Sequence, residues 1–195
     1  MLVEQIGATL VTIAKDVKLQ VEWNPAKVKA FRLIGYENRV LAHQDFNDDQ
    51  RDAGEIGAGH TVTALYEIVP PGVEVAVPGV DPLKYQRPAP VRGSDSGELL
   101  TLKLRYKQPD GDQSALMEVA LPDDGQAFDA APSDFRFAAA VAAFGMTLRD
   151  SPYKGEADLA KALAWARASL GDDPGSLRAE FVTLVERACT LSRPR

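Results

Sequence analysis

The 195-residue sequence has few of the residues that catalytic and metal sites use most often. It contains one cysteine, Cys189, and two histidines, His43 and His60. A single cysteine cannot form an internal disulfide, and neither histidine stands at a zinc-ligand spacing from the other or from the cysteine. Cys189 falls at a core position of a helical pattern, so we interpret it as a small buried side chain. Because nucleophile, base and cofactor patterns are all missing, the sequence predicts a protein that is not an enzyme.

Long apolar runs and basic clusters are missing as well. No stretch approaches the roughly 20 apolar residues that cross a bilayer, and the first residues lack the basic-then-apolar order of a signal peptide. Lysine and arginine total 22 against 28 acidic residues, a net charge of −6, and no group of them makes a phosphate-binding face. These absences predict a soluble chain that neither inserts into a membrane nor binds nucleic acid.

Alternating apolar and polar residues are plentiful in the first two thirds of the chain. They predict strands over 17–23, 28–36, 61–69, 99–107 and 115–121. The last two strands flank a turn at Pro109 and Gly111 and are predicted to pair as a hairpin. The run 28–36 is apolar on both sides at its centre, which is typical of a central strand. The predicted core residues of this domain are Trp23, Phe31, Leu33, Tyr66, Leu102 and Leu104.

Helical periodicity marks both ends of the chain. Residues 1–16 predict a short amphipathic helix, and an alanine-rich portion over 132–192 predicts three helices. The first of the three begins at Ser133 or Asp134, the second covers 156–170, and the third begins at the Asp173–Pro174 pair. The fold class is therefore predicted as α+β. An antiparallel β-sandwich-like sheet over 17–122 is followed by three helices that pack on it.

Two long segments interrupt the predicted strands. A proline-rich excursion covers 70–98, and an acidic loop covers 37–60. Within the loop, Asp45, Asn47 and Asp49 match the first, third and fifth positions of a calcium-binding loop, but the glycine and the final glutamate of that pattern are absent. We therefore predict no metal ligands, with these three residues as the only candidates. The loop is interpreted as an exposed interaction surface, made by Asp45, Asp48, Asp49, Asp52 and Glu55.

Several runs carry a resemblance to a known family. They are QVEWNPAKV at 20–28, RLIGYENR at 32–39, DFNDD at 45–49, DAGEIGAGHTVTALYEI at 52–68, VDPLKY at 80–85, LKLRYK at 102–107 and RAEFV at 178–182. In these runs the chain resembles the C-terminal region of bacterial von Willebrand factor type A (VWA) domain-containing proteins. The resemblance covers almost the whole chain. That region of the family is a domain of unknown function, so no residue role can be carried over.

The resemblance implies which domain precedes this region, which partners it has and where it is located, but it implies no chemical role for individual residues. In that family a VWA domain precedes the region, so residues 1–16 are expected to be the last helix of that domain, left by an artificial truncation. The expected partners are the adjacent VWA domain and an unknown protein, and the expected location is the cell envelope or outside the cytoplasm. A divalent cation is expected only in the VWA domain, because its Asp-x-Ser-x-Ser motif is absent here.

Two functions follow from these observations. The first is a non-catalytic interaction or scaffold module of a larger protein that supports adhesion or assembly. The alternative is a ligand-binding domain that holds calcium or a glycan with the acidic loop and the proline-rich excursion.

Overall fold

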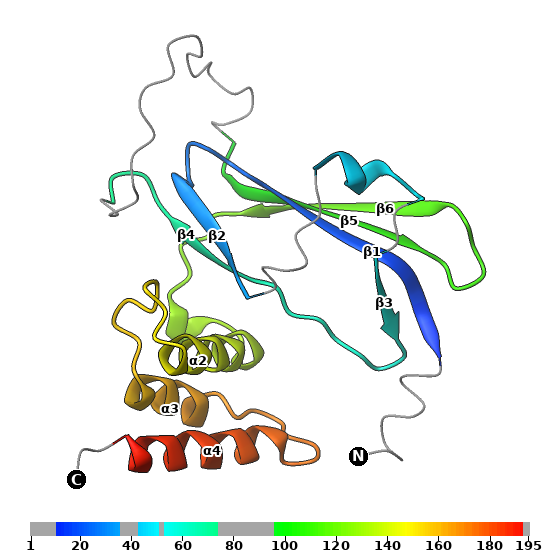
Figure 1. The fold of residues 1–195 in the computed structure, drawn as a ribbon. Coiled ribbons are helices and arrows are strands. Elements are labelled where there is room, and N and C mark those ends of the chain that lie inside the picture. Colours follow the sequence, from blue (N-terminus) through cyan, green and yellow to red (C-terminus); the bar gives the residue numbers. More distant parts are fainter. Residues whose placement is uncertain (1–10, 36–42, 51–52, 74–95, 193–195) are drawn as a thin grey trace. The chain divides into compact units, whose positions relative to one another are not determined.

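The computed structural model of this chain describes residues 11–35, 43–50, 53–73 and 96–192. The chain divides into two compact units, residues 1–124 and 125–195. Strands make up the first unit and helices the second, as Figure 1 shows. The expected mixture of antiparallel sheets and three C-terminal helices is therefore confirmed. The strands are β1 (Thr12–Trp23), β2 (Ala30–Ile34), β3 (Gly54–Gly57), β4 (Leu65–Val69), β5 (Glu98–Lys107) and β6 (Ser114–Pro122).

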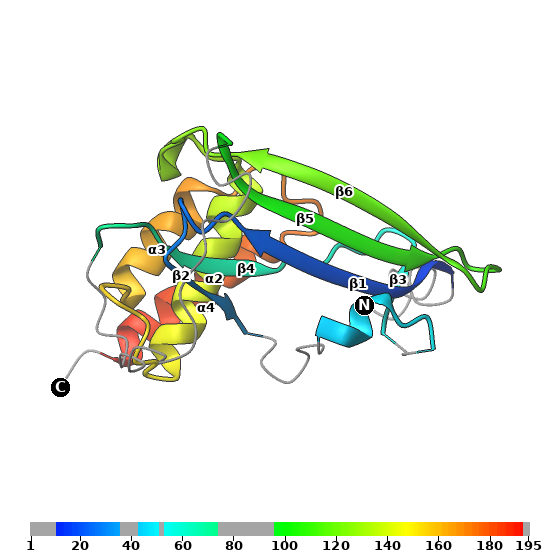
Figure 2. The ribbon, with the colours of Figure 1, turned by 90° about the horizontal axis from the view of Figure 1, so that it is seen from above.

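Four of the strands form one antiparallel sheet in the order β3-β1-β5-β6. Figure 2 shows β1, β5 and β6 side by side along most of their length. The predicted hairpin is confirmed as β5 and β6, in which Leu102 lies opposite Val119. In this register the alternating sequence places apolar side chains of neighbouring strands on the same face. β6 is an edge strand, because β5 is its sole partner among the described strands.

The segment predicted as a central strand is instead part of a two-stranded sheet. β2 pairs only with β4 within the described residues, and Phe31, its second residue, is 55% exposed. The aromatic part of the predicted core nevertheless assembles. The Trp23 ring lies 5.4 Å from Phe31 and 5.5 Å from Tyr66, and burial raises the pKa of the Tyr66 hydroxyl. Leu102 and Leu104 are only half-buried.

The predicted N-terminal helix is wrong where the structure can be compared with it. Residues 12–16 belong to β1, and residues 1–10 lie outside the described part of the chain. Thr12 and Ile13 are β-branched, and such side chains pack well on a pleated surface but lose rotamer freedom in a helix. A second difference is β3, a short strand inside the predicted acidic loop. It pairs with β1 through an irregular register.

The helical unit has its own core. Its helices are α2 (Ser133–Leu148), α3 (Leu159–Ala168) and α4 (Leu177–Leu191), preceded by the short 3-10 helix η3 (Phe128–Ala130). Ala162 and Val185 are fully buried, and Phe144 is 8% exposed and meets Phe181 edge to face at 5.4 Å. Small residues at buried helix positions let neighbouring backbones approach closely. Cys189 packs against this core, as its position in the sequence predicts.

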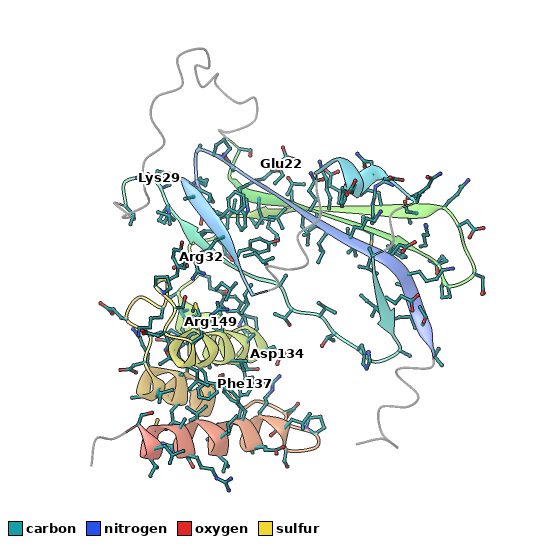
Figure 3. The ribbon with its side chains drawn as sticks, viewed as in Figure 1. Glu22, Lys29, Arg32, Asp134, Phe137 and Arg149 are labelled. Atoms are coloured by element: carbon teal, nitrogen blue, oxygen red, sulfur yellow. The ribbon has the colours of Figure 1, made fainter. Side chains whose placement is uncertain are left out.

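The start of α4 is held by an aspartate outside the helix. The Asp173 carboxylate accepts hydrogen bonds from the backbone amides of Arg178 and Ala179, and these bonds lower its pKa. Asp173 therefore caps the helix as predicted, although α4 begins at Leu177 and not beside Pro174. The Arg178 guanidinium donates to the Leu170 carbonyl, pairs with Asp134 and lies 5.0 Å from the ring centre of Phe137 on α2. Figure 3 labels Asp134 and Phe137.

None of the helices in the described parts of the chain is long and apolar enough to span a membrane.

Candidate functional site

The acidic loop is the one predicted interaction surface. Its residues 45–49 contact charged side chains of the large sheet, and its residues 54–57 form β3, the strand of that sheet that pairs with β1. We call residues 43–50 and 53–57 the acidic segment. It comprises the 3-10 helix η2 (His43–Asn47), the turn after it, and β3. η2 is the cyan helix in Figure 1. We call the sheet face that carries Lys18, Lys103, Arg105 and Lys107 the basic face, on the register of β1 and β5. Figure 3 labels Glu22, which shares this face and pairs with Lys103 at 3.3 Å.

Lys18 anchors the C-terminal end of η2. Its side chain is buried, with 4% of the residue exposed, and its ammonium donates to the backbone carbonyls of Asp45 and Asp48. The last carbonyls of a helix have no partner within the helix, and a cation is favourable there. This lysine therefore satisfies backbone acceptors of the acidic segment instead of pairing with a carboxylate.

Phe46 provides the apolar contact beneath the same helix. It is 6% exposed, although it stands between polar residues in the sequence. The Arg105 guanidinium lies 5.7 Å from the centre of its ring, a cation-π geometry. Arg105 also donates to the Ser114 hydroxyl at 2.8 Å. The arginine of β5 is thus covered by an aromatic ring from the acidic segment.

Asp49 binds the end of the β5–β6 hairpin. Its carboxylate accepts hydrogen bonds from the Ser114 hydroxyl and backbone amide, and it lies 3.9 Å from Arg105. The Lys107 ammonium donates to the Asp49 carbonyl at 2.7 Å. The Ser114 hydroxyl, more than the nearby cations, lowers the pKa of Asp49. A carboxylate so bound is stabilised in its charged form.

Asp16 connects the acidic segment to the sheet from a bulge in β1. The register of β1 and β5 shifts between Lys15 and Lys18, and Asp16 at this point has a φ of 50°, a left-handed conformation that is uncommon for a residue with a side chain. Its carboxylate accepts from the Ala53 amide at 3.1 Å and from the Lys107 ammonium at 2.7 Å. The hydrogen bond to Asp16 raises the pKa of Lys107.

The structure separates the five predicted surface residues into different environments. Asp45 and Asp48 are half-buried, and the Asp48 side chain accepts from the Gln50 amide in a local turn. Asp49 is exposed but engaged by β6, and Glu55 is exposed, with the Thr12 hydroxyl donating to it at 3.4 Å. Asp52 lies outside the described residues. Of the four described residues of the predicted surface, Asp49 and Glu55 are thus exposed and Asp45 and Asp48 are half-buried. Their role as an interaction surface stays a prediction.

The basic face also differs from its prediction. The alternating lysines and arginine of 101–107 predict a solvated face, but the side chains of Lys103, Arg105 and Lys107 are only 12–27% exposed. Asp16, Lys18, Phe46 and Ser114 complete this arrangement and were not singled out from the sequence. The sequence contained one signal for this arrangement: Phe46 is an isolated aromatic residue in an acidic loop, and lysine and arginine alternate along 103–107.

Metal ligation gains no support from this geometry. Among the described residues, no group of three or more histidine, cysteine, aspartate or glutamate side chains is placed to hold a metal ion. Asp49, one of the three calcium candidates, directs its carboxylate to Ser114. Asn47 is exposed on η2.

Protonation of Asp49 is expected to loosen the acidic segment at low pH. Its folded pKa lies below the ordinary value of 3.8, so its contribution to docking is complete above about pH 3.8 and is lost as the pH falls through the lowered value. Protection factors over 43–50, which correct for the intrinsic pH dependence of amide exchange, should fall as the pH drops below about 3.8, relative to those of the β5–β6 peptide of the same molecule. Asp49→Asn should abolish this difference, and an unchanged pH response in that variant would contradict the assignment.

Comparison with known proteins shows that this chain is similar to the C-terminal region of longer proteins. Residues 8–191 match the family described as "Uncharacterized protein YfbK, C-terminal". A protein of Escherichia coli (strain K12), described as "Uncharacterized protein YfbK", is 43% identical over 180 residues. The aligned region covers 92% of this chain and 30% of that protein, so the chain spans less than a third of its relative. No solved structure matches the chain.

Proposed function

Because the chain belongs to the family of YfbK C-terminal regions, we propose that it is a non-catalytic interaction module of a larger bacterial protein. The observation that carries this proposal is the anchoring of the acidic segment. Its backbone is fixed at Lys18, Asp16 and Lys107, while Asn47, Gln50 and Glu55 stay exposed. A surface that is ordered before binding loses less conformational entropy when a partner arrives.

The context of the module is part of the proposal. The family resemblance in the sequence supports a preceding VWA domain as the neighbouring part of the polypeptide. It also supports a role in adhesion or assembly at the cell envelope. In this arrangement the divalent cation belongs to the VWA domain, and this region contributes polar and acidic contacts to an adjacent domain or to a second protein.

The competing proposal is a ligand-binding domain for calcium or a glycan. Calcium would require carboxylates that converge on one point, whereas the Asp49 carboxylate is bound to β6 and the Asp48 carboxylate to its own turn. The interaction role therefore requires no change in the observed structure of the acidic segment, whereas calcium binding would require the segment to rearrange.

A binding experiment with a neutralised surface tests the proposal. The triple variant Asp45→Asn, Asp48→Asn and Glu55→Gln keeps the shape of the segment and removes three charges. We expect it to capture the preceding domain at least about tenfold less than wild type, and wild-type capture to weaken with salt because exposed charges are screened. Glu156→Gln is the matched control, because it neutralises a carboxylate in the helical unit whose side chain is 94% exposed. Equal capture by wild type and the triple variant would contradict the proposal.

Calorimetry with calcium alone distinguishes the alternative. Micromolar binding of calcium that disappears in the Asp45→Asn and Asp49→Asn variants would overturn the interaction-only role. We expect no heat of binding, because most of the segment's oxygen ligands already accept hydrogen bonds from the protein.

A further inference from the structure

The face of the large sheet opposite the basic face is apolar at every central position. The register of β1, β5 and β6 fixes its composition, because residues directly opposite each other share a face. Nine side chains make up this face, which we call the apolar array: Leu19, Val21, Trp23, Leu100, Leu102, Leu104, Met117, Val119 and Leu121. The array contains no charged residue.

Four of the nine side chains of this array are exposed to solvent, and none of the nine is fully buried. Leu19, Met117, Val119 and Leu121 are 42–50% exposed, and the other five residues are half-buried. The contacts of Trp23 with Phe31 and Tyr66 cover one corner. The two faces of the sheet therefore differ. The acidic segment covers part of the charged face, whereas the described strands of the same unit cover only the Trp23 corner of the apolar face.

An apolar face of this size is a docking surface. With strands about 4.8 Å apart and same-face residues about 6.8 Å apart along each strand, the three-by-three array covers roughly 300 Å². Contiguous apolar patches of a few hundred Å² are at the upper end of what soluble monomers expose, and they mark interaction sites. Because the array carries no charge, covering it removes apolar surface from water without desolvating a charged group.

We infer that the apolar array docks onto the preceding part of the longer polypeptide, through an uncharged apolar surface of that part. This inference rests on the proposed function and identifies a second contact of the same module. In the E. coli relative the aligned region is 30% of the protein, so 100 − 30 = 70% of that polypeptide lies outside it, and the family description places the region at the C-terminal end. An occupant from the same polypeptide is present in a ratio of one occupant to one array, whatever the protein concentration.

The area of the array favours a tethered occupant over a second copy of this chain. Stable complexes between separate proteins bury about 800 Å² on each partner, more than twice the estimated area of the array. A tethered segment needs less area, because a short flexible linker provides an effective concentration in the millimolar range. The array is thus large enough for an intramolecular interface and small for a stable dimer.

Cysteine labelling on adjacent residues of β6 tests this inference. Leu116 and Met117 are 49% and 50% exposed and point to opposite faces of the sheet, so they form a matched pair. In a Cys189→Ala background, Met117→Cys and Leu116→Cys are each reacted with a maleimide, in this chain and in the longer polypeptide that includes its native preceding sequence. We expect similar rates in this chain, and at least a tenfold slower reaction of Met117→Cys alone in the longer polypeptide.

Each other outcome overturns the inference. Equal rates in the longer polypeptide would show that the array stays open. Protection of Met117→Cys in this chain that is lost on dilution would identify a second copy as the occupant, and protection independent of concentration would identify another part of the same chain. Val119→Cys and Ala120→Cys form a second matched pair on the same strand if either first variant misfolds. The labelling experiment changes no residue of the acidic segment, so protection of Met117→Cys tests this inference whether or not neutralising that segment weakens capture. The salt dependence of capture tests the acidic contact alone, because the array carries no charge.

Discussion

Replacing Phe144 with alanine is expected to lower the free energy of unfolding of the helical unit by about 3–5 kcal/mol. The ring is 8% exposed, meets Phe181 edge to face at 5.4 Å, and belongs to the same cluster as Val185 and Ala162. Its removal leaves a cavity that alanine and valine neighbours are too short to fill, so the lost transfer energy and the cavity energy add. For a unit of about 70 residues this is a large part of the total stability.

Urea denaturation followed by far-UV circular dichroism measures this effect. Trp165, which lies 4.8 Å from the Phe128 ring, gives a second signal from the same unit through its fluorescence. Leu191→Ala is the control, because Leu191 is 85% exposed at the end of α4 and its truncation should cost less than about 0.5 kcal/mol. Similar midpoints for the two variants would show that Phe144 does not hold the three helices together.

Replacing Lys18 with methionine is expected to release the acidic segment from the sheet. The change keeps the length and the apolar stem of the side chain and removes the ammonium that donates to the Asp45 and Asp48 carbonyls. The Asp45 carbonyl keeps the Asp48 amide as a donor at 3.3 Å, whereas the Asp48 carbonyl loses the ammonium. A buried acceptor left without a donor costs about 1–3 kcal/mol. Release of the segment would also uncover Phe46, which is 6% exposed in the folded protein.

Amide hydrogen exchange over 43–50 and the midpoint of urea unfolding of the strand unit report this release. The matched control is Lys27→Met, because the Lys27 ion pair with Asp123 is about 40% exposed on both sides and such pairs contribute about 0–1 kcal/mol. Faster exchange over 43–50 in Lys18→Met, with little change in Lys27→Met, is the expected result. Normal protection of the segment in Lys18→Met would mean that Asp16 and Lys107 hold it without the buried lysine.

The sequence determined the elements whose signal is local. The β5–β6 hairpin follows from strict alternation on either side of a proline and glycine turn. The three helices follow from apolar residues at helical spacing, with Asp173 near the start of the third. Cys189 packs against the core of the helices where periodicity places it, although it is half-buried. These features depend on contacts within a few residues along the chain.

Tertiary structure alone decided which face of the sheet is covered. Charge alternation predicts that the cations of β5 face water and that the leucines face a core, yet the acidic segment covers Arg105 and Lys107. The reason is that Lys18 and Asp16 on β1 complete the site from a distant part of the sequence, through backbone carbonyls and a bulge that no composition reveals. The run 28–36 was predicted to be a central strand, but β2 has one partner strand among the described residues. An apolar run indicates burial without indicating the number of partner strands.

Residues 12–16 illustrate the same limit at the level of secondary structure. Apolar residues at positions 2, 6, 10 and 13 fit a helix, but the pairing of β1 with β5 extends the strand back past Val17 to Lys15, and its pairing with β3 continues it to Thr12. Hydrogen bonds to two neighbouring strands outweigh a local helical preference of a few tenths of a kcal/mol per residue. The local sequence pattern thus determined the helices, which form their own hydrogen bonds, and the hairpin, whose strands are adjacent in sequence. Pairing between strands that are distant in sequence determined the strand boundaries, the register and which face of the sheet stays exposed.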